Sequence, residues 1–276
     1  MSEAPTLYEL RHGAAWITLN APERRNALND ALIASLSDHV RRALADDGAR
    51  CIVLTGAGKA FCAGADLKGV AATAPEEPSP FVRLLTDLLH APKPVIAAVN
   101  GVAFAGGLGL VAAADIAIAV ETVTFSFSEV RIGVIPAIIG VVCVPRIGAA
   151  RAMQLFLTGE TFDAAAAAAY GLIHRTAPVG GLEAAVQADV DMIGRGGPRA
   201  LAEAKALVRR LAAQDLETAF AWTQARSFAL FASEEGQEGM AAFREKRSPR
   251  WVSGGGGNEA GRPLAPPPRP SSVDGD

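Results

Sequence analysis

Cysteine and histidine are scarce in this chain of 276 residues. Its three cysteines, Cys51, Cys62 and Cys143, include no CxxC pair. An odd number of cysteines without such pairs predicts no disulfide framework, and a reducing, cytoplasmic location is the expectation that follows. The four histidines lie far apart in the sequence and lack the spacing of a metal-binding helix. The sequence therefore predicts no metal site.

An excess of positive charge is also missing. Lys and Arg number 26 against 29 Asp and Glu, which gives a net charge of −3. Because the basic residues are scattered, no nucleic-acid partner is predicted. The N-terminus lacks the basic and apolar segments of a signal peptide. The most apolar long segment, 95–120, is interrupted by Asn100, Asp115 and several glycines, so no membrane partner is expected.

Apolar residues, in contrast, make up half of the chain and follow regular patterns. Short apolar runs bounded by turn residues predict strands at 14–19, 51–55, 95–99, 116–119 and 124–127. Helical periodicity predicts helices at 29–44, 80–90, 107–114, 149–157, 181–195, 198–211, 215–231 and 234–246. This order predicts an α/β core at residues 1–195, a C-terminal helical subdomain at 196–251 and a disordered Gly/Pro-rich tail at 252–276.

Two turns of small residues are the candidates for chemistry. Residues 60–68 read Ala-Phe-Cys-Ala-Gly-Ala-Asp-Leu-Lys, and residues 100–107 read Asn-Gly-Val-Ala-Phe-Ala-Gly-Gly. Turns built from Gly and Ala let a ligand approach the backbone closely. Two such turns can direct two N–H groups at one oxygen, as an oxyanion hole requires. Cys62 has no basic residue pattern around it and is interpreted as a packing residue.

Together with three further segments, these turns resemble the crotonase superfamily and, more narrowly, the enoyl-CoA hydratase/isomerase family. The five segments that carry the resemblance are 22–28, 58–67, 100–107, 129–136 and 243–249. The resemblance implies a crotonase-like (ClpP/crotonase) α/β spiral of β-β-α units. It also implies that the C-terminal helices join copies of the chain into a homo-oligomer, either a trimer or a hexamer made as a dimer of trimers.

The same resemblance implies an acyl-CoA thioester as substrate, with coenzyme A entering as part of it and no separate cofactor. The backbone N–H groups of Ala65 and Gly106 would stabilise the thioester oxyanion, and Glu129 would carry the proton. The residues implied to bind coenzyme A are Arg25, Ala27, Ala63, Asp66, Leu67, Lys68, Phe243 and Lys246, the last two often serving a neighbouring subunit. For the three basic residues among them, a solvated surface charge is the alternative.

One carboxylate stands where well-known hydratases of the family use two. The first of their two glutamates lies three residues after the oxyanion glycine, at the position of Gly109 here, and the second matches Glu129. The apolar neighbours of Glu129 predict a raised pKa, which suits proton transfer near neutral pH; a buried ion pair with Arg131 is the alternative. Asp66 is expected to brace the oxyanion turn, and Asp115 the junction between a helix and a strand.

Three functions stay open at this point. The first is an enoyl-CoA hydratase, because 129–137 and the Gly-Gly-Leu-Gly-Leu segment resemble hydratases of methylglutaconyl-type and isohexenylglutaconyl-type CoA esters. Those substrates carry a second carboxylate, which would orient the water that Gly109 cannot. The second is an enoyl-CoA isomerase, in which Glu129 moves a proton along the acyl chain. The third is an acyl-CoA-binding protein without turnover.

Overall fold

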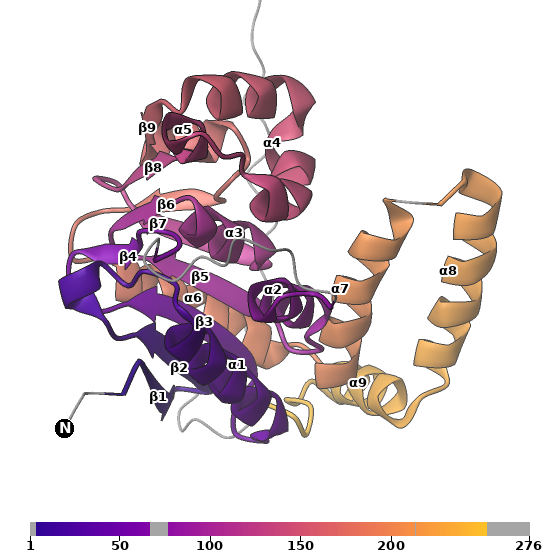
Figure 1. Cartoon of the computed structure of the whole chain (residues 1–276). Helices are drawn as coiled ribbons and strands as arrows, with labels where there is room; N and C mark the ends of the chain where they lie inside the picture. Colours follow the sequence, from indigo (N-terminus) through magenta and orange to yellow (C-terminus); the bar gives the residue numbers. More distant parts are fainter. Residues whose placement is uncertain (1–3, 67–76, 213, 253–276) are drawn as a thin grey trace, which may run out of the picture.

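The computed structural model describes residues 4–66, 77–212 and 214–252. Leu67, Lys68 and the predicted disordered tail from residue 253 onward lie outside the described residues. Within the described part, two β-sheets with flanking helices form a core, and three C-terminal helices extend from it (Figure 1).

The larger sheet has six strands, of which the first two form an antiparallel hairpin and the others are parallel. Its order is β1 (Thr6–Arg11), β2 (Ala14–Leu19), β3 (Cys51–Gly56), β5 (Val95–Val99), β7 (Ile116–Val120) and β10 (Arg175–Ala177). The smaller sheet has the order β4 (Ala60–Cys62), β6 (Val102–Phe104), β8 (Thr124–Ser126) and β9 (Thr161–Asp163).

The chain repeats a β-β-α unit that adds one strand to each sheet in turn. The units are β3-β4-α2 (Pro80–His90), β5-β6-α3 (Gly106–Ala113) and β7-β8-α4 (Ala137–Thr158), the last with a short 3₁₀ helix, η3 (Glu129–Ile132), before its α-helix. Every unit therefore places the end of its second strand at the same edge of the small sheet. The predicted α/β spiral is confirmed.

The larger sheet is buried on both faces, as parallel sheets require. Side chains alternate along each strand, so Ile17 faces the large core cluster with α1 (Asp30–Ala45), whereas Trp16 faces α6 (Leu182–Arg195). The helix α1 begins where the sequence predicts, because the Asn29 side chain accepts a hydrogen bond from the Leu32 N–H at 2.9 Å.

The helix α4 differs most from the sequence prediction, which places a helix only at 149–157. The observed helix spans 22 residues and breaks at Gly148, where φ is +75°, so it consists of two segments. Pro145 and Gly148 interrupt the apolar periodicity, so the sequence pattern does not reveal the first helical segment, which lies before Gly148. By length and composition α4 is the one helix among the described residues that could cross a membrane, although a core helix passes the same test. Its buried residues include Ile139 and Cys143, which belong to the core cluster.

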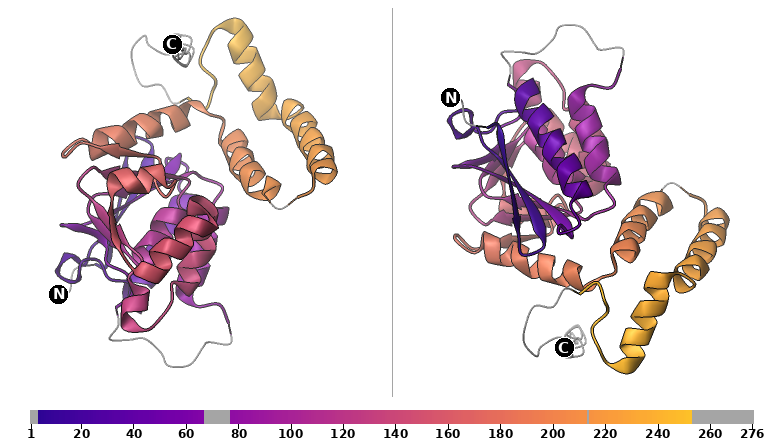
Figure 2. Two further views of the ribbon diagram at one scale, coloured as in Figure 1. Left: turned by 90° about the horizontal axis from the view of Figure 1, so that it is seen from above. Right: turned by 90° about the horizontal axis from the view of Figure 1, so that it is seen from below.

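The C-terminal helices α7 (Pro198–Leu211), α8 (Leu216–Phe231) and α9 (Glu234–Glu245) project from the core as an arm (Figure 2). One face of α8 is apolar and exposed: its large side chains Leu216, Phe220, Phe228 and Phe231 are 59–74% exposed. The chain returns to the core after α9, where the Trp251 indole N–H donates to the Arg195 carbonyl at 3.1 Å.

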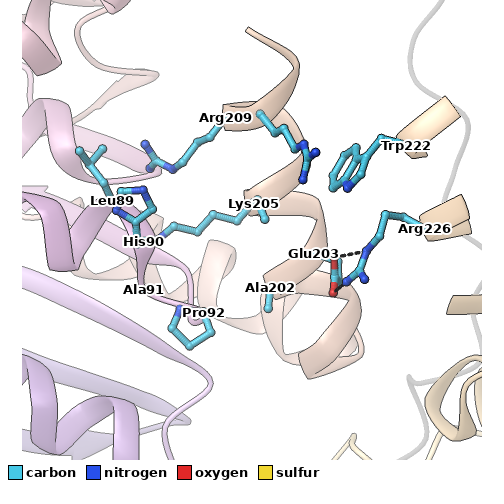
Figure 3. A pocket seen from close by; sticks show the side chains of 12 residues that line it. Leu89, His90, Ala91, Pro92, Ala202, Glu203, Lys205, Arg209, Trp222 and Arg226 are labelled. Atoms are coloured by element: carbon cyan, nitrogen blue, oxygen red, sulfur yellow. Dashed lines mark hydrogen bonds and ion pairs between the residues drawn. The ribbon is translucent and has the colours of Figure 1, made fainter. Parts of the chain in front are cut away.

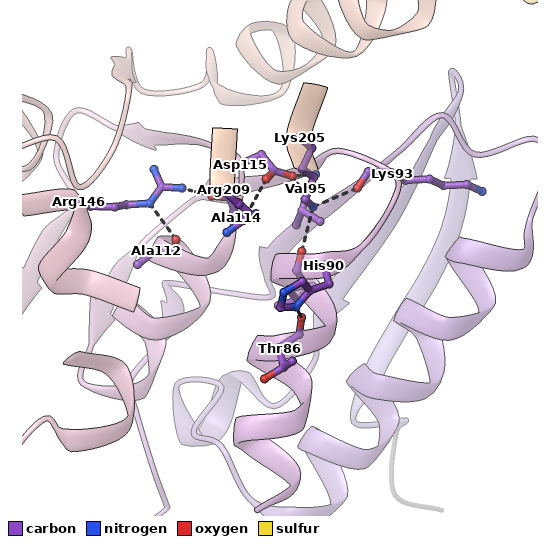
Figure 4. A network of polar contacts seen from close by, with 11 residues as sticks. Thr86, His90, Lys93, Val95, Ala112, Ala114, Asp115, Arg146, Lys205 and Arg209 are labelled. Carbon is purple, nitrogen blue, oxygen red and sulfur yellow. Dashed lines mark hydrogen bonds and ion pairs between the residues drawn. The ribbon is translucent and has the colours of Figure 1, made fainter. Parts of the chain in front are cut away.

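A half-buried carboxylate, Asp115, fastens this arm to the core (Figure 4). It lies between α3 and β7 and accepts from the Val95 N–H at 2.8 Å. It also pairs with two cations of α7, Lys205 at 2.7 Å and Arg209 at 2.9 Å. The predicted bracing role of Asp115 at the helix-to-strand junction is confirmed, and the structure extends it to α7.

Candidate active site

The first small-residue turn is held by a buried asparagine on the neighbouring loop. Asn26 is fully buried in a left-handed conformation, with φ +56°. Its side chain accepts from the Ala21 N–H at 2.9 Å and donates to the Ala57 carbonyl at 3.0 Å and the Ala60 carbonyl at 2.8 Å. These bonds satisfy the buried amide and fix the loop against the start of β4.

Backbone hydrogen bonds then align this loop with the turn that contains Ala65. The Leu28 N–H donates to the Gly64 carbonyl at 2.7 Å, and the Asp66 N–H donates to the Leu28 carbonyl at 2.8 Å. Ala65 lies between these bonds and is exposed. Its own N–H donates to no acceptor in the described part of the chain. The pattern thus leaves the Ala65 N–H available to a ligand.

Four residues predicted to bind coenzyme A are assembled by the same contacts. The Ala63 N–H donates to the Arg25 carbonyl at 3.0 Å, and Ala27 follows in the paired loop. The Asp66 carboxylate accepts from the Arg24 guanidinium at 3.5 Å. Their place beside Ala65 fits the predicted role in binding, which stays a prediction.

The second turn leads into α3 through a strained residue. Ala105 has φ +46° and ψ −117°, a conformation that costs about 1–3 kcal/mol for a residue with a side chain. Its N–H donates to the Ser126 carbonyl at 3.1 Å. Gly106 is the first residue of α3, so its N–H has no partner within the helix and carries the partial positive charge of the helix N-terminus.

The structure brings the two turns into direct contact. A Cβ atom built on Gly64 would lie 2.8 Å from the Ala105 Cβ and 3.4 Å from the Gly106 nitrogen. A Cβ atom on Gly106 would lie 3.6 Å from the Gly64 Cα. Only residues without bulk allow this approach. The N–H groups of Ala65 and Gly106 thus come from touching turns, as an oxyanion hole requires.

Glu129 follows β8 as the first residue of η3. Its side chain is half-buried, and its Oε2 atom is enclosed without a hydrogen-bond partner among the residues that the structure describes. Burial raises the pKa of this carboxyl above its ordinary value. The described residues show no ion pair between Glu129 and Arg131, whose side chain instead packs at Gly159. The burial of the carboxyl agrees with the predicted raised pKa, and the predicted alternative, an ion pair with Arg131, is not formed among the described residues.

Side chains from other helices fill the space beside Gly109, which lies one helical turn after Gly106. A Cβ atom on Gly109 would lie 2.6 Å from the Ile139 Cγ2 and 3.5 Å from the Phe81 Cζ. Gly109 is therefore enclosed by apolar side chains from α2 and α4. Sequence reasoning missed Phe81 and Ile139, since no local signal distinguishes them from other apolar residues of a helix.

Comparisons with known proteins show the family of this chain. The model of the enoyl-CoA hydratase/isomerase family matches residues 9–254. The chain belongs to the enoyl-CoA hydratase/isomerase family. A Rhodobacter capsulatus protein named "Probable enoyl-CoA hydratase" is 38% identical, over 91% of this chain and 99% of its own. The 1,2-epoxyphenylacetyl-CoA isomerase of Escherichia coli is 34% identical, over 89% of this chain and 97% of its own.

Solved structures of this family share the fold. An enoyl-CoA hydratase from Shewanella pealeana superposes with a TM-score of 0.85 at 34% identity, covering 90% of this chain and 96% of that chain. An enoyl-CoA hydratase from Mycobacterium smegmatis gives 0.83 at 33% identity, covering 90% of this chain and 99% of that chain. The hydratase/isomerase family therefore accounts for both the core and the C-terminal helices.

Phe243 and Lys246 lie apart from the hydratase/isomerase site within one chain. Phe243 is 87% exposed on α9, and Lys246 ends that helix in a left-handed conformation. Neither forms a hydrogen bond or ion pair with the two turns in the described residues. Their predicted contact with coenzyme A stays a prediction.

A cavity of about 670 Å³ lies elsewhere, between the end of α2 and the helices α7 and α8 (Figure 3). Most of its charged side chains already have partners. Lys205 and Arg209 pair with Asp115, and Arg226 pairs with Glu203. Arg210 stacks over the Trp222 ring at 4.3 Å. We therefore interpret this cavity as part of the junction at which the arm is attached to the core.

The described residues support neither a cysteine nucleophile nor a metal site. Burial raises the pKa of the Cys62 thiol to about 12, so this residue is a poor nucleophile and is a packing residue, as the sequence predicts. Within the ranges 4–66, 77–212 and 214–252, no three His, Cys, Asp or Glu residues gather as a metal site would require.

Proposed function

We propose that the chain adds water reversibly to an α,β-unsaturated acyl-CoA thioester, with Glu129 as its single acid–base residue. The carboxyl of Glu129 carries this proposal, because its enclosed, unpartnered oxygen and raised pKa are the properties of a group that gains and loses a proton near neutral pH. Family membership supports the substrate class, and several relatives are named as enoyl-CoA hydratases.

The two oxyanion donors and Glu129 have different roles in the proposed reaction. The N–H groups of Ala65 and Gly106 hold the thioester oxygen and stabilise the negative charge that develops on it. The Glu129 carboxylate takes one proton from water while the water oxygen bonds to Cβ, and the electrons of the double bond move to the thioester oxygen. Glu129 then returns the proton to Cα. Loss of one such backbone donor typically costs about 3 kcal/mol of transition-state stabilisation.

The carboxylate that position 109 lacks is supplied by the substrate. Since Gly109 carries no acid and is enclosed by Ile139 and Phe81, the α3 side of the site offers no group to hold the water. We infer that a second carboxylate on the acyl group, as in methylglutaconyl-type esters, orients it. A straight-chain enoyl-CoA is then hydrated far more slowly than a glutaconyl-type ester.

Mass spectrometry of the products tests the reaction. The purified protein is offered straight-chain 2-enoyl-CoA, straight-chain 3-enoyl-CoA and 3-methylglutaconyl-CoA. A product heavier by one water, formed fastest from the dicarboxylic ester, is the expected result. Equal hydration rates for the straight-chain and dicarboxylic esters contradict substrate assistance.

An isomerase is the second candidate, and the apolar enclosure of Gly109 favours it. A 1,3-proton shift needs the oxyanion donors and Glu129 but no positioned water. A product of unchanged mass with a moved double bond identifies this reaction.

The variant Glu129→Gln separates both enzymes from a protein that only binds acyl-CoA. A catalyst loses at least about 100-fold in rate and still binds the ester, whereas the exposed control Glu121→Gln leaves the rate unchanged. If no ester is turned over by the unaltered protein, the binding function takes the place of both reactions.

We also propose that the chain works as a trimer or a dimer of trimers in the cytoplasm. The exposed apolar face of α8 supports self-association, and three buried free cysteines fit a reducing compartment. In such an assembly Phe243 and Lys246 of one subunit would reach the coenzyme A held by Arg25, Ala27, Ala63 and Asp66 of another. Leu67 and Lys68 belong to the same proposed binding segment.

A further inference from the structure

A single aromatic side chain lies along the face of α3 that starts at the oxyanion donor. Gly106 and Gly109 are one helical turn apart and share this face. A Cβ atom on Gly106 would lie 3.7 Å from the Phe81 Cζ, and one on Gly109 would lie 3.5 Å from the same atom. Phe81 therefore covers the helix from the donor to position 109.

Ile139 closes the same face from α4. Its Cγ2 would lie 2.6 Å and its Cβ 3.3 Å from a Cβ atom on Gly109. The first distance is shorter than real Cβ contacts, so any side chain at position 109 must displace Ile139. Ile139 is only 4% exposed, and a β-branched side chain in a helix has one strongly preferred rotamer. It therefore cannot swing aside at low cost.

The contact between α4 and α3 continues one helical turn beyond Ile139. Cys143, one turn after Ile139 on α4, donates its thiol hydrogen to the Leu108 carbonyl at 3.7 Å. Burial, and after it the charge of Glu129, raises the pKa of this thiol. The face of α4 that carries Ile139 and Cys143 therefore packs against α3.

We propose that Ile139 and Phe81 are specificity-determining residues, because they occupy the place from which a second carboxylate would hold water opposite Glu129. Together they form an apolar wall along the first turn of α3, beside the oxyanion donor Gly106, and Ile139 keeps position 109 without a side chain. Water addition is thereby restricted to acyl groups that hold the water themselves. This inference rests on the proposed function and names the residues that set its substrate class.

Binding of a saturated ester tests the wall without any turnover. Calorimetry with butyryl-CoA compares the unaltered protein with Gly109→Glu, with Gly109→Glu/Ile139→Ala and with the matched control Gly109→Glu/Ile138→Ala. Ile138 is the neighbouring residue of α4 and is 43% exposed. We expect Gly109→Glu to weaken binding at least tenfold or to lower the melting temperature, and only the Ile139 double variant to restore both. The proposal is overturned if Gly109→Glu leaves butyryl-CoA binding and the melting temperature unchanged. It is also overturned if Ile138→Ala restores them as well as Ile139→Ala does.

Hydration rates test the consequence for substrate choice. Gly109→Glu/Ile139→Ala is expected to raise the rate with crotonyl-CoA, relative to 3-methylglutaconyl-CoA, at least tenfold over the unaltered protein. An unchanged ratio in a double variant that binds both esters overturns the role of the wall. If binding is rescued but the unaltered protein hydrates no ester, the proposed reaction fails while the steric role of Ile139 stands.

Discussion

At the residue scale, the ionised form of the Glu129 carboxyl destabilises the folded state, because the carboxyl is half-buried. Because burial raises its pKa above the unfolded value of about 4.3, the native state holds this proton more tightly than the unfolded chain does. Below the unfolded value both states are protonated and no penalty exists. As the pH rises toward the folded pKa the unfolded chain ionises first, and stability is lost.

Removing this charge therefore has a pH-dependent effect on stability. We expect Glu129→Gln to raise the melting temperature at pH 8 more than at pH 4, while it lowers turnover at least about 100-fold. Thermal unfolding followed at both pH values measures this difference. The exposed control Glu121→Gln is expected to shift both melting temperatures alike; an equal shift for Glu129→Gln would contradict the burial argument.

Two helical glycines give opposite predictions for the same substitution. In Gly107→Ala the new Cβ would lie 2.4 Å from the Cys62 carbonyl oxygen, and this backbone atom cannot yield. Overpacking of this kind costs about 1–3 kcal/mol. In Gly140→Ala the nearest atom is the Phe156 Cε2 at 3.7 Å, an ordinary contact, and alanine gains about 1 kcal/mol of helix propensity. The shift of the urea midpoint, negative for Gly107→Ala and positive for Gly140→Ala, checks both signs.

At the element scale, the attachment of α7 to the core depends on the charge of Asp115. In Asp115→Asn the amide still accepts a hydrogen bond from Val95 but leaves Lys205 and Arg209 without an anion. Lys205 is 8% exposed, so its charge is poorly solvated. We expect the free energy of unfolding to fall by about 3 kcal/mol, measured by urea denaturation. The exposed pair of Asp38 and Arg41 provides the control, since Asp38→Asn is expected to change it by less than about 0.5 kcal/mol.

The elements that the sequence predicts well are those with long patterns and clear ends. The helix α2 matches its prediction at both ends, where the Ser79 side chain caps the start and Pro80 follows. The strands β4, β6, β9 and β10 have three residues each and are too short to show a period. They form because the neighbouring strands of the spiral offer hydrogen-bond partners, which no local pattern reveals.

At the scale of the whole molecule, the apolar face of α8 predicts self-association. Phe228 is 69% exposed in the single chain, and charging it removes apolar area from any interface there. We expect the unaltered protein to sediment as a trimer or hexamer and Phe228→Glu to sediment as a smaller species. Gln224→Glu adds the same charge to an exposed polar position of α8 and is expected to keep the assembly. A monomeric unaltered protein would contradict the proposal.

The candidate site could be predicted from the sequence only where each residue belongs to a short local motif. Ala65 and Gly106 follow from two recognisable turns, and Glu129 follows from a third motif. The contact of Ile139 with Gly109 joins residues 30 positions apart through a helix segment that the sequence does not reveal. Absence of an acid at position 109 is readable in the sequence, but its structural cause is not.

The tight approach of Ile139 to Gly109 also limits the order in which mutations can alter this chemistry. A chain that first gains an acid at position 109 passes through an overpacked intermediate, whereas one that first shortens Ile139 passes through a cavity. Each first step lowers stability, and only the second step restores the packing. A change that introduces an acid at position 109 therefore needs two substitutions whose effects on packing compensate each other.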